Sequence, residues 1–225
     1  MSIQELIDKQ LVSEQESRTT RERSGLWNPS MFGCCYRRQW FNRTNTLPSD
    51  PFDNRTLRVF KAGNLFEKFV IDLYLIQNPT AQTQVLIKTE DICGYADLVE
   101  EEIVSDIKSQ HSKSFWYMTK SEDIRKDKYN NWLQVMWYAW ELQLPKGKLC
   151  FISKDDLCIQ EYIQDFEDGY WIDELAKEMA NLTLVWKEEM PKPKPRLYGK
   201  NKDDTPRECG WCLWKTLCFK LQKEE

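Results

Sequence analysis

The sequence predicts a mixed α/β fold in which a small sheet lies among long helices. Three β-prone runs with short polar turns between them are typical of an antiparallel meander: residues 82–88, 92–99 and 103–109. Two stretches with apolar residues at helical spacing flank the meander and predict helices: residues 55–77 and 122–144. Two more strands and a helix complete the expected core: residues 148–153, 158–163 and 167–188.

The composition is that of a globular protein. A chain of 225 residues with 41% hydrophobic content can bury roughly 70% of its unfolded surface. The net charge is only -4, so the chain as a whole is not basic enough to predict nucleic-acid binding. If it binds nucleic acid, it must do so through local basic patches. Apolar runs stay shorter than the roughly 18 residues of a membrane span, and the polar start does not resemble a signal peptide. We therefore expect a soluble, cytoplasmic protein.

The segments before the long helix predict two shorter helices. Residues 2–23 show weak helical periodicity and end in a charged run that we expect to be flexible. The helix-start signal Asn28-Pro29-Ser30 predicts a helix over residues 30–43. Three of its residues would share one face: Cys35, Arg38 and Gln39.

Two later stretches lack a periodic pattern. Residues 111–120 are expected to be irregular, and residues 190–196 alternate Pro with Lys or Arg and should run extended, as a linker or a strap that contacts phosphate. We expect one compact domain with an N-terminal helical segment, a core and a tail that is basic, Pro-rich and then Cys-rich: residues 1–28, 29–189 and 190–225.

Three charged residues occupy unusual positions in the second hairpin. Asp97 lies inside its first strand, and Asp106 and Lys108 flank Ile107 in the next, so alternation places Asp106 and Lys108 on one face. A buried carboxylate is costly unless a cation meets it, and two carboxylates on adjacent strands suit a divalent metal. The alternative is the solvated face of an edge strand, because Asp-x-Lys is a common tripeptide.

The pattern of Asp97 followed by Asp106-Ile107-Lys108 resembles the two central motifs of the PD-(D/E)xK nuclease core. The order of helix, three strands, helix, strand and helix is that of the restriction-endonuclease-like fold. The resemblance implies a metal-dependent DNA exonuclease, a hydrolase of phosphodiester bonds that prefers single-stranded ends.

Two helical motifs extend the resemblance to the RecB-like nucleases. Gly63-Asn64-Leu65-Phe66-Glu67 resembles their first motif, with Glu67 where many relatives have His; the alternative is a surface Glu that pairs with a nearby Lys. Gln134 and Tyr138 resemble the Q-x-x-x-Y motif that follows the active-site strands, within an aromatic stripe that also suits a helix core.

The resemblance also implies roles for these residues. The carboxylates of Glu67, Asp97 and Asp106 with the carbonyl of Ile107 would hold Mg²⁺ or Mn²⁺, and Lys108 would orient the attacking water or stabilise charge. Gln134 and Tyr138 complete the catalytic set, with the glutamine holding the lysine or a phosphate. Four further residues are expected to bind DNA, by phosphate contacts or by stacking on a base: Arg37, Arg38, Lys113 and Trp116.

Eight cysteines in a chain expected inside the cell favour metal binding over disulfides. Cys209, Cys212 and Cys218 form C-x2-C-x5-C within ten residues, and a tetrahedral thiolate site needs a fourth ligand. That ligand must come from upstream, and the candidates are Cys34, Cys35, Cys93, Cys150, Cys158 and His111.

An N-terminal cysteine followed by Arg-Arg, a nuclease core and this C-terminal motif resemble the iron-sulfur RecB-like exonucleases. These include the CRISPR-associated Cas-four family and the AddB nuclease domain. The resemblance implies a four-iron four-sulfur cluster that staples the two ends of the chain, with Cys34 as an alternative first ligand and zinc as the alternative metal: Cys35, Cys209, Cys212 and Cys218.

Partners would be DNA and proteins of DNA processing or CRISPR adaptation, with no membrane. A non-catalytic DNA-binding or assembly module of the same fold, and a zinc-binding interaction protein, are the alternatives. The polarity of digestion, the oligomeric state and the pathway stay open at this point.

Overall fold

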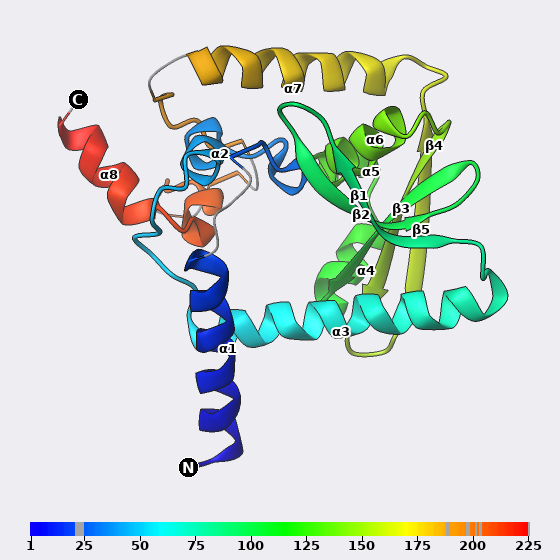
Figure 1. The fold of residues 1–225 in the computed structure, drawn as a ribbon, viewed down its shortest axis with the longest axis horizontal. Coiled ribbons are helices and arrows are strands. Elements are labelled where there is room, and N and C mark those ends of the chain that lie inside the picture. Colours follow the sequence, from blue (N-terminus) through cyan, green and yellow to red (C-terminus); the bar gives the residue numbers. More distant parts are fainter. Residues whose placement is uncertain (21–24, 188–189, 197–198, 201, 203, 225) are drawn as a thin grey trace. The chain divides into compact units, whose positions relative to one another are not determined.

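The structure, a computed structural model, describes residues 1–20, 25–187, 190–196, 199–200, 202 and 204–224 (Figure 1). Two compact units can be distinguished within it. The sheet unit comprises Asn28–Gly33 and Gly63–Asn181. The cysteine unit comprises the described residues of Met1–Trp27, Cys34–Ala62 and Leu182–Glu225. The expected division into three parts stays a prediction.

The sheet unit contains a five-stranded sheet in the order β1-β2-β3-β4-β5. Its strands are β1 (Gln82–Lys88), β2 (Cys93–Val99), β3 (Ile103–Gln110), β4 (Lys146–Ser153) and β5 (Ile159–Asp165). The first three form the predicted antiparallel meander, β4 runs parallel to β3, and β5 runs antiparallel to β4. The mixed α/β prediction and the five strand positions are therefore confirmed.

Helices cover both faces of this sheet (Figure 1). The helices are α3 (Asn54–Gln77), α4 (Ser112–Thr119), α5 (Ile124–Asp127), α6 (Tyr129–Glu141) and α7 (Tyr170–Lys187). Met136 of α6 lies against Gly147 of β4. Ile71 of α3 packs with Ile107 of β3 and Cys150 of β4. Gly147 and Cys150 lie on opposite faces of β4, so α6 and α3 pack on opposite faces of the sheet at β3 and β4. Asp106 and Lys108 both belong to β3.

The helix predicted over residues 122–144 is divided in two. Lys128 ends α5 and precedes α6 with φ of −121° and ψ of 29°, outside the helical range. The aromatic stripe of α6 is core, as its spacing suggested, since Trp132, Met136 and Trp137 are buried. Periodicity therefore predicted the buried face of α6 but not the break at Lys128.

Residues 112–119 are helical, so the prediction that residues 111–120 are irregular is wrong. The ring Nδ1 of His111 accepts from the Lys113 amide and caps α4, and Phe115 and Met118 form its buried face. The helix predicted over residues 30–43 is confirmed only for residues 36–43, because Gly33, with φ of 75°, separates a short 3₁₀ helix from that α-helix. Those two elements are η1 (Pro29–Met31) and α2 (Tyr36–Arg43).

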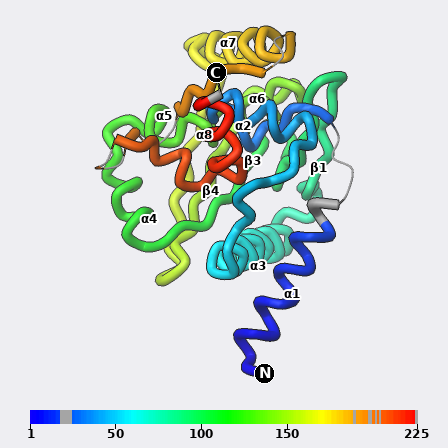
Figure 2. Tube along the Cα trace, turned by 90° about the vertical axis from the view of Figure 1, so that its left-hand side faces the viewer, coloured from blue at the N-terminus to red at the C-terminus, as the bar shows by residue number. Residues whose placement is uncertain are grey.

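The cysteine unit contains α1 (Ile3–Thr20), α2, η2 (Arg207–Trp211), α8 (Lys215–Glu224) and the adjoining ends of α3 and α7. α2 and α8 lie side by side although they are far apart in sequence (Figure 2). The Trp214 indole donates to the Thr46 carbonyl over 3.0 Å, and the Asp50 carboxylate accepts from Thr216. These bonds join the tail to the loop after α2. Of the charged run predicted to be flexible, residues 18–20 belong to α1, and residues 21–23 lie outside the described residues.

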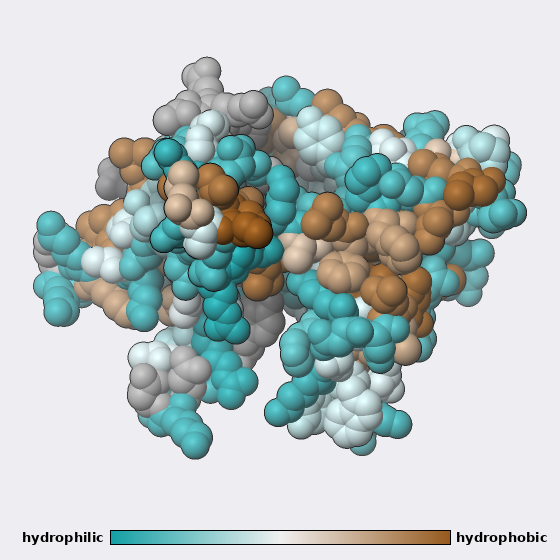
Figure 3. All heavy atoms as spheres, turned by 90° about the horizontal axis from the view of Figure 1, so that it is seen from below, coloured by the Kyte–Doolittle hydropathy of each residue, from teal (hydrophilic) through white to brown (hydrophobic). Residues whose placement is uncertain are grey.

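α3 exposes an apolar stripe within the sheet unit. Leu65, Phe69, Leu73 and Ile76 recur at intervals of three and four and are exposed. Figure 3 shows apolar side chains gathered over this helix. The stripe that predicted the helix is thus not its buried face, which carries Ile71 instead. Among the described helices, none is both long and apolar enough to span a bilayer.

Candidate active site

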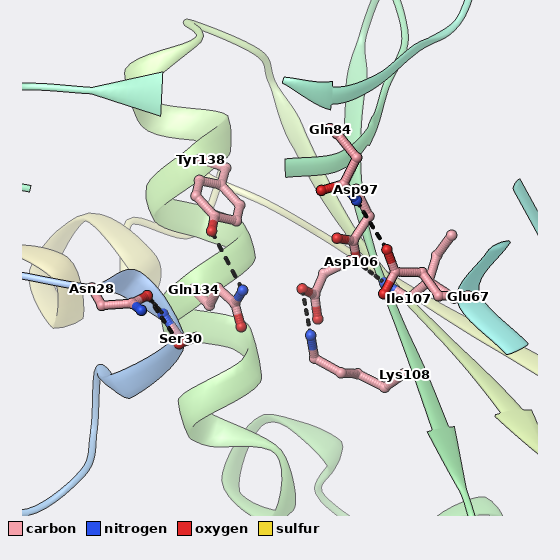
Figure 4. Close-up of polar contacts among 10 residues, drawn as sticks. All are labelled: Asn28, Ser30, Glu67, Gln84, Asp97, Asp106, Ile107, Lys108, Gln134 and Tyr138. Atoms are coloured by element: carbon pink, nitrogen blue, oxygen red, sulfur yellow. Dashed lines mark hydrogen bonds and ion pairs between the residues drawn. The ribbon is translucent and has the colours of Figure 1, made fainter. Parts of the chain in front are cut away.

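The site lies where the ladder between β2 and β3 ends. Leu98 pairs with Ser105 and Val99 with Val104. Beyond these pairs a side chain accepts the next hydrogen bond from β3: the Ile107 amide donates to Oδ2 of Asp97 over 2.8 Å (Figure 4). A carboxylate therefore occupies the position where a backbone acceptor would continue the ladder.

Asp106 and Lys108 share one face of β3, as alternation predicted. Lys108 Nζ donates to Asp106 Oδ1 over 2.7 Å, and Asp106 is only 1% exposed. Asp106 is in register with Leu149, two residues along β4 from Gly147, so it lies on the face that α6 covers. Its second oxygen, Oδ2, is buried and has no hydrogen-bond partner among the described residues. Such an atom is costly to bury unless something else binds it.

Glu67 reaches this site from α3, held by a residue that sequence reasoning missed. The Gln84 side-chain amide donates to Glu67 Oε1 over 2.9 Å and also hydrogen-bonds Asp97, where it opposes part of the rise in pKa that burial causes. Gln84 has φ of 49° in the middle of β1, a conformation rare for residues other than glycine. A polar residue in a strand pattern was its only signal, and that does not distinguish it from a solvated position.

The carboxyls of this site are held in a strongly negative, buried setting. Burial raises the pKa of Glu67, and the charge of Asp97 adds to it. Burial likewise raises the pKa of Asp97, although the Lys108 ammonium opposes the shift. The pKa of Asp106 rises to about 7 through burial and the neighbouring carboxylates. Burial disfavours the Lys108 ammonium, but Asp106 and Asp97 outweigh this and raise the pKa of Lys108.

The raised pKa of Asp106 predicts a specific pH dependence of stability. Its folded pKa of about 7 lies above the value of 3.8 for a free side chain, so its contribution is fully present below about pH 4 and is lost as the pH rises through 7. Asp106→Asn should therefore become more stable relative to the wild type between pH 5 and pH 8. Urea unfolding in EDTA at both pH values measures this.

The exposed Asp72→Asn on α3 is the matched control for that measurement and should show a smaller pH-dependent difference. An Asp106→Asn difference that stays constant across the range would contradict the raised pKa.

Gln134 and Tyr138 line the same region from α6. The Gln134 amide donates to the Tyr138 hydroxyl over 3.4 Å, and Figure 4 shows Gln134 on the side of α6 that faces Asp106 and Lys108. Burial raises the pKa of Tyr138, so the hydroxyl stays neutral. A Cβ on Gly94 of β2 would lie 2.7 Å from that hydroxyl and 3.0 Å from the Pro29 ring. Glycine is thus required for β2 to approach α6 this closely.

Gly94→Ala should lower the free energy of unfolding by about 1 to 3 kcal/mol, because the added methyl group must displace the Tyr138 hydroxyl or the Pro29 ring. Gly63→Ala in α3 is the control of opposite sign. Its Cβ would make an ordinary 3.6 Å contact with Ser109, and the better helix propensity should raise stability by up to about 1 kcal/mol. Equal effects in thermal unfolding would contradict the close packing at Gly94.

The residues expected to bind DNA differ in accessibility. Arg37 is 1% exposed and its Nε donates to the Pro191 carbonyl over 2.6 Å, so the expected phosphate contact from Arg37 is contradicted by its burial. Arg38 lies 3.9 Å from Glu208 and stays a prediction. Lys113 and Trp116 are exposed on α4 and also stay predictions.

The cysteine unit contains a separate pocket of about 180 Å³. All four expected cluster ligands line it, together with Arg38, Glu208 and Phe219 among others: Cys35, Cys209, Cys212 and Cys218. Cys34 is buried and does not line it, which favours Cys35 as the first ligand. Cys35 precedes α2 as its N-cap, so the helical face it was expected to share with Arg38 and Gln39 is not formed.

Backbone and acidic groups fix Cys35 in this pocket. Its sulfur accepts from the Lys194 amide over 3.3 Å, so the Pro-rich strap touches the pocket. Its own amide donates to Glu208 Oε1 over 2.6 Å, and Oε2 of the same carboxylate accepts from the Arg196 amide. Glu208, only 2% exposed, therefore links the strap, α2 and the cysteine motif.

Burial raises the pKa of two of these thiols, Cys209 and Cys212, and so favours their protonated forms. Burial raises the pKa of Cys209 to about 11, and Cys212 and Cys35 add to the rise. A metal group that binds here must replace these protons, so its affinity would depend on pH. Among the described residues, His, Cys, Asp and Glu side chains form no group of three or more already arranged around one metal ion.

No family model and no curated protein matches this chain. Among solved structures, it is similar to a protein described as SSO0001, with a TM-score of 0.57 and 19% identity over 97% of this chain and 96% of that one. It is also similar to LHK-Exo, an alkaline exonuclease from Laribacter hongkongensis, with a TM-score of 0.50 and 12% identity over 73% of this chain and 91% of that one. These similarities establish a shared mixed α/β fold.

Proposed function

We propose that this chain is a divalent-metal-dependent DNA exonuclease that removes nucleotides from single-stranded ends. The observation that carries the proposal is the convergence of Glu67, Asp97, Asp106 and Lys108 from α3, β2 and β3 at the end of one ladder. A fold shared with an alkaline exonuclease supports it. Fold alone does not determine activity, which depends on the residues of the site.

The carboxylates fit a hard divalent cation. Asp106 Oδ2 is buried without a hydrogen-bond partner among the described residues. The negative charge of Asp97 raises the pKa of both Asp106 and Glu67, in addition to the effect of burial. Glu67, Asp97 and Asp106 with the Ile107 carbonyl would hold Mg²⁺ or Mn²⁺, which prefer oxygen ligands. Bound there, the cation would supply Lewis-acid polarisation of the phosphodiester and a more acidic water.

The chain's own residues complete the chemistry. The Lys108 ammonium stabilises negative charge on the phosphate and orients the attacking water, and its bond to Asp106 holds it in position. The raised pKa of Lys108 keeps it charged at neutral pH. The Gln134 carbonyl oxygen would accept from the Lys108 ammonium, or its amide nitrogen would donate to a phosphate oxygen, while its bond to Tyr138 fixes its orientation.

The cysteine pocket would hold a four-iron four-sulfur cluster on Cys35, Cys209, Cys212 and Cys218. All four cysteines line one pocket, as four thiolate ligands of a single group require. Zinc, the alternative, would draw the four sulfurs to about 2.3 Å from one point. The cluster would join α2 to the C-terminal tail and stabilise the cysteine unit. Hydrolysis requires no electron transfer from it.

Cleavage of end-labelled single-stranded DNA by anaerobically purified protein tests the activity. We expect loss of the strand with Mg²⁺ or Mn²⁺, none with EDTA, and a product ladder that shows the polarity. Binding without cleavage under every metal condition would contradict the exonuclease proposal and favour a non-catalytic module.

A further inference from the structure

One face of α4 combines two exposed aromatic rings with two lysines. Lys113, Trp116, Tyr117 and Lys120 are spaced three, four and seven residues from the first, so they lie on one side of the helix, opposite Phe115 and Met118. Trp116 and Tyr117 are 56% and 59% exposed. Their rings pack edge to face, with centroids 5.1 Å apart. We call these four residues the α4 face.

The α4 face follows directly from the strand that carries the candidate active site. β3 ends at Gln110 and α4 begins at Ser112. The Gln110 side chain reaches Met118 Sδ over 2.9 Å, which fastens the helix to the end of the strand. The chain from Lys108 to Trp116 spans at most roughly 20 Å, from the reach of an extended and then helical backbone. A stacked single strand covers that span with roughly six nucleotides.

The chemistry of the α4 face suits single-stranded nucleic acid better than a protein. Protein interfaces are depleted in lysine at their centres, whereas here lysines flank both rings. Neither Lys113 nor Lys120 has an ion pair among the described residues. Every base offers a flat face to an aromatic ring, and its phosphates attract ammonium groups, so rings between lysines match the repeating unit of a single strand.

We propose that the α4 face binds single-stranded DNA by stacking bases on Trp116 and Tyr117 while Lys113 and Lys120 contact phosphates, which places the strand leading to Lys108. This rests on the proposed function for the direction of the strand, but binding itself can be measured without cleavage. Duplex DNA keeps its bases stacked on one another and offers no free base faces, so the α4 face would discriminate against it.

The test is fluorescence anisotropy of a labelled 20-nucleotide oligo(dT) in EDTA, which prevents cleavage. The double variant Trp116→Ala, Tyr117→Ala should raise Kd by roughly tenfold or more, from the energy of base stacking. Trp116→Phe, Tyr117→Phe keeps both rings and should recover most of the affinity. The control Trp140→Ala removes a ring of similar exposure, 51%, from the end of α6 and should leave Kd unchanged.

Two further readouts separate this proposal from the proposed function. The Lys113→Gln, Lys120→Gln double variant should reduce the slope of log affinity against log salt by about 1.4, from roughly 0.7 per phosphate contact. Hydrolysis of thymidine 5′-p-nitrophenyl phosphate, which is too short to reach α4, should be unchanged in the alanine double variant. If the wild type hydrolyses neither this ester nor DNA, the exonuclease proposal fails while the binding data still decide the α4 face.

An alanine double variant that folds and binds oligo(dT) as tightly as the wild type would overturn the proposal. The proposal would also be overturned if the alanine double variant lost as much affinity for duplex DNA as for oligo(dT). A change in self-association without a change in Kd would assign the α4 face to a protein interface instead.

Discussion

Replacing Lys108 with alanine is expected to reduce DNA cleavage by roughly a thousandfold, while single-stranded DNA still binds. The ammonium lies 2.7 Å from Asp106 and its pKa is raised, so it is a charged group fixed beside the carboxylates of the candidate active site. Removal of one such charge-stabilising or proton-handling group costs roughly 10²- to 10⁴-fold in rate. Single-turnover cleavage of end-labelled DNA measures the loss without contributions from product release.

Asp106→Asn should lose activity to a similar extent, because it removes a carboxylate proposed to hold the divalent cation. Lys108→Arg keeps the charge and should retain part of the activity. Lys88→Ala removes an exposed lysine at the end of β1 and serves as the matched control. Full activity in both Lys108→Ala and Asp106→Asn would overturn the active-site assignment.

Replacing Cys209 with serine is expected to abolish the brown absorbance of an iron-sulfur cluster and to destabilise the cysteine unit. The cluster would close a loop between Cys35 and Cys209 that is longer than a hundred residues. A crosslink over such a loop contributes roughly 5 kcal/mol in a loop-closure description. Iron, sulfide and zinc analysis, together with thermal unfolding of the anaerobic protein, measures both effects.

Two other cysteines provide controls for this prediction. Cys158 is exposed and lies outside the pocket, so Cys158→Ser should keep the cluster and the stability. Cys34→Ser should also keep the iron, whereas Cys35→Ser should lose it, since Cys35 lines the pocket and Cys34 does not. An iron content of four atoms per chain, without zinc, in the Cys209→Ser variant would contradict the ligand assignment. Zinc in place of iron in the wild type would favour the single-ion site.

Local patterns determined most of the secondary structure of this protein. The three strands of the meander and the helix over residues 54–77 have alternation or helical spacing that does not depend on distant residues. The same alternation placed Asp106 and Lys108 on one face, which their 2.7 Å bond confirms. Spacing also grouped Cys209, Cys212 and Cys218 and predicted a thiolate site whose fourth ligand would come from elsewhere in the chain.

Errors arose where packing outweighs local preference. Residues 112–119 form a helix because Phe115 and Met118 are buried and His111 caps the first turn. The break at Lys128 lies where the backbone leaves the helical range, and the turn at Gly33 needs a positive φ and a close approach to Asn130 of α6. Arg37 looked like a phosphate ligand in the sequence, but its burial against the Pro191 carbonyl assigns it to the cysteine unit instead.

The sequence by itself determined which residues have chemistry suited to metal, phosphate and sulfur, because residue type and local spacing are encoded in adjacent positions. Only the tertiary structure decided which of them meet. Gln84 joins Glu67 to Asp97, Cys35 rather than Cys34 enters the thiol pocket, and Trp116 rather than Phe115 is exposed. Each of these outcomes depends on contacts between segments far apart in the chain, whose burial and charge no local pattern specifies.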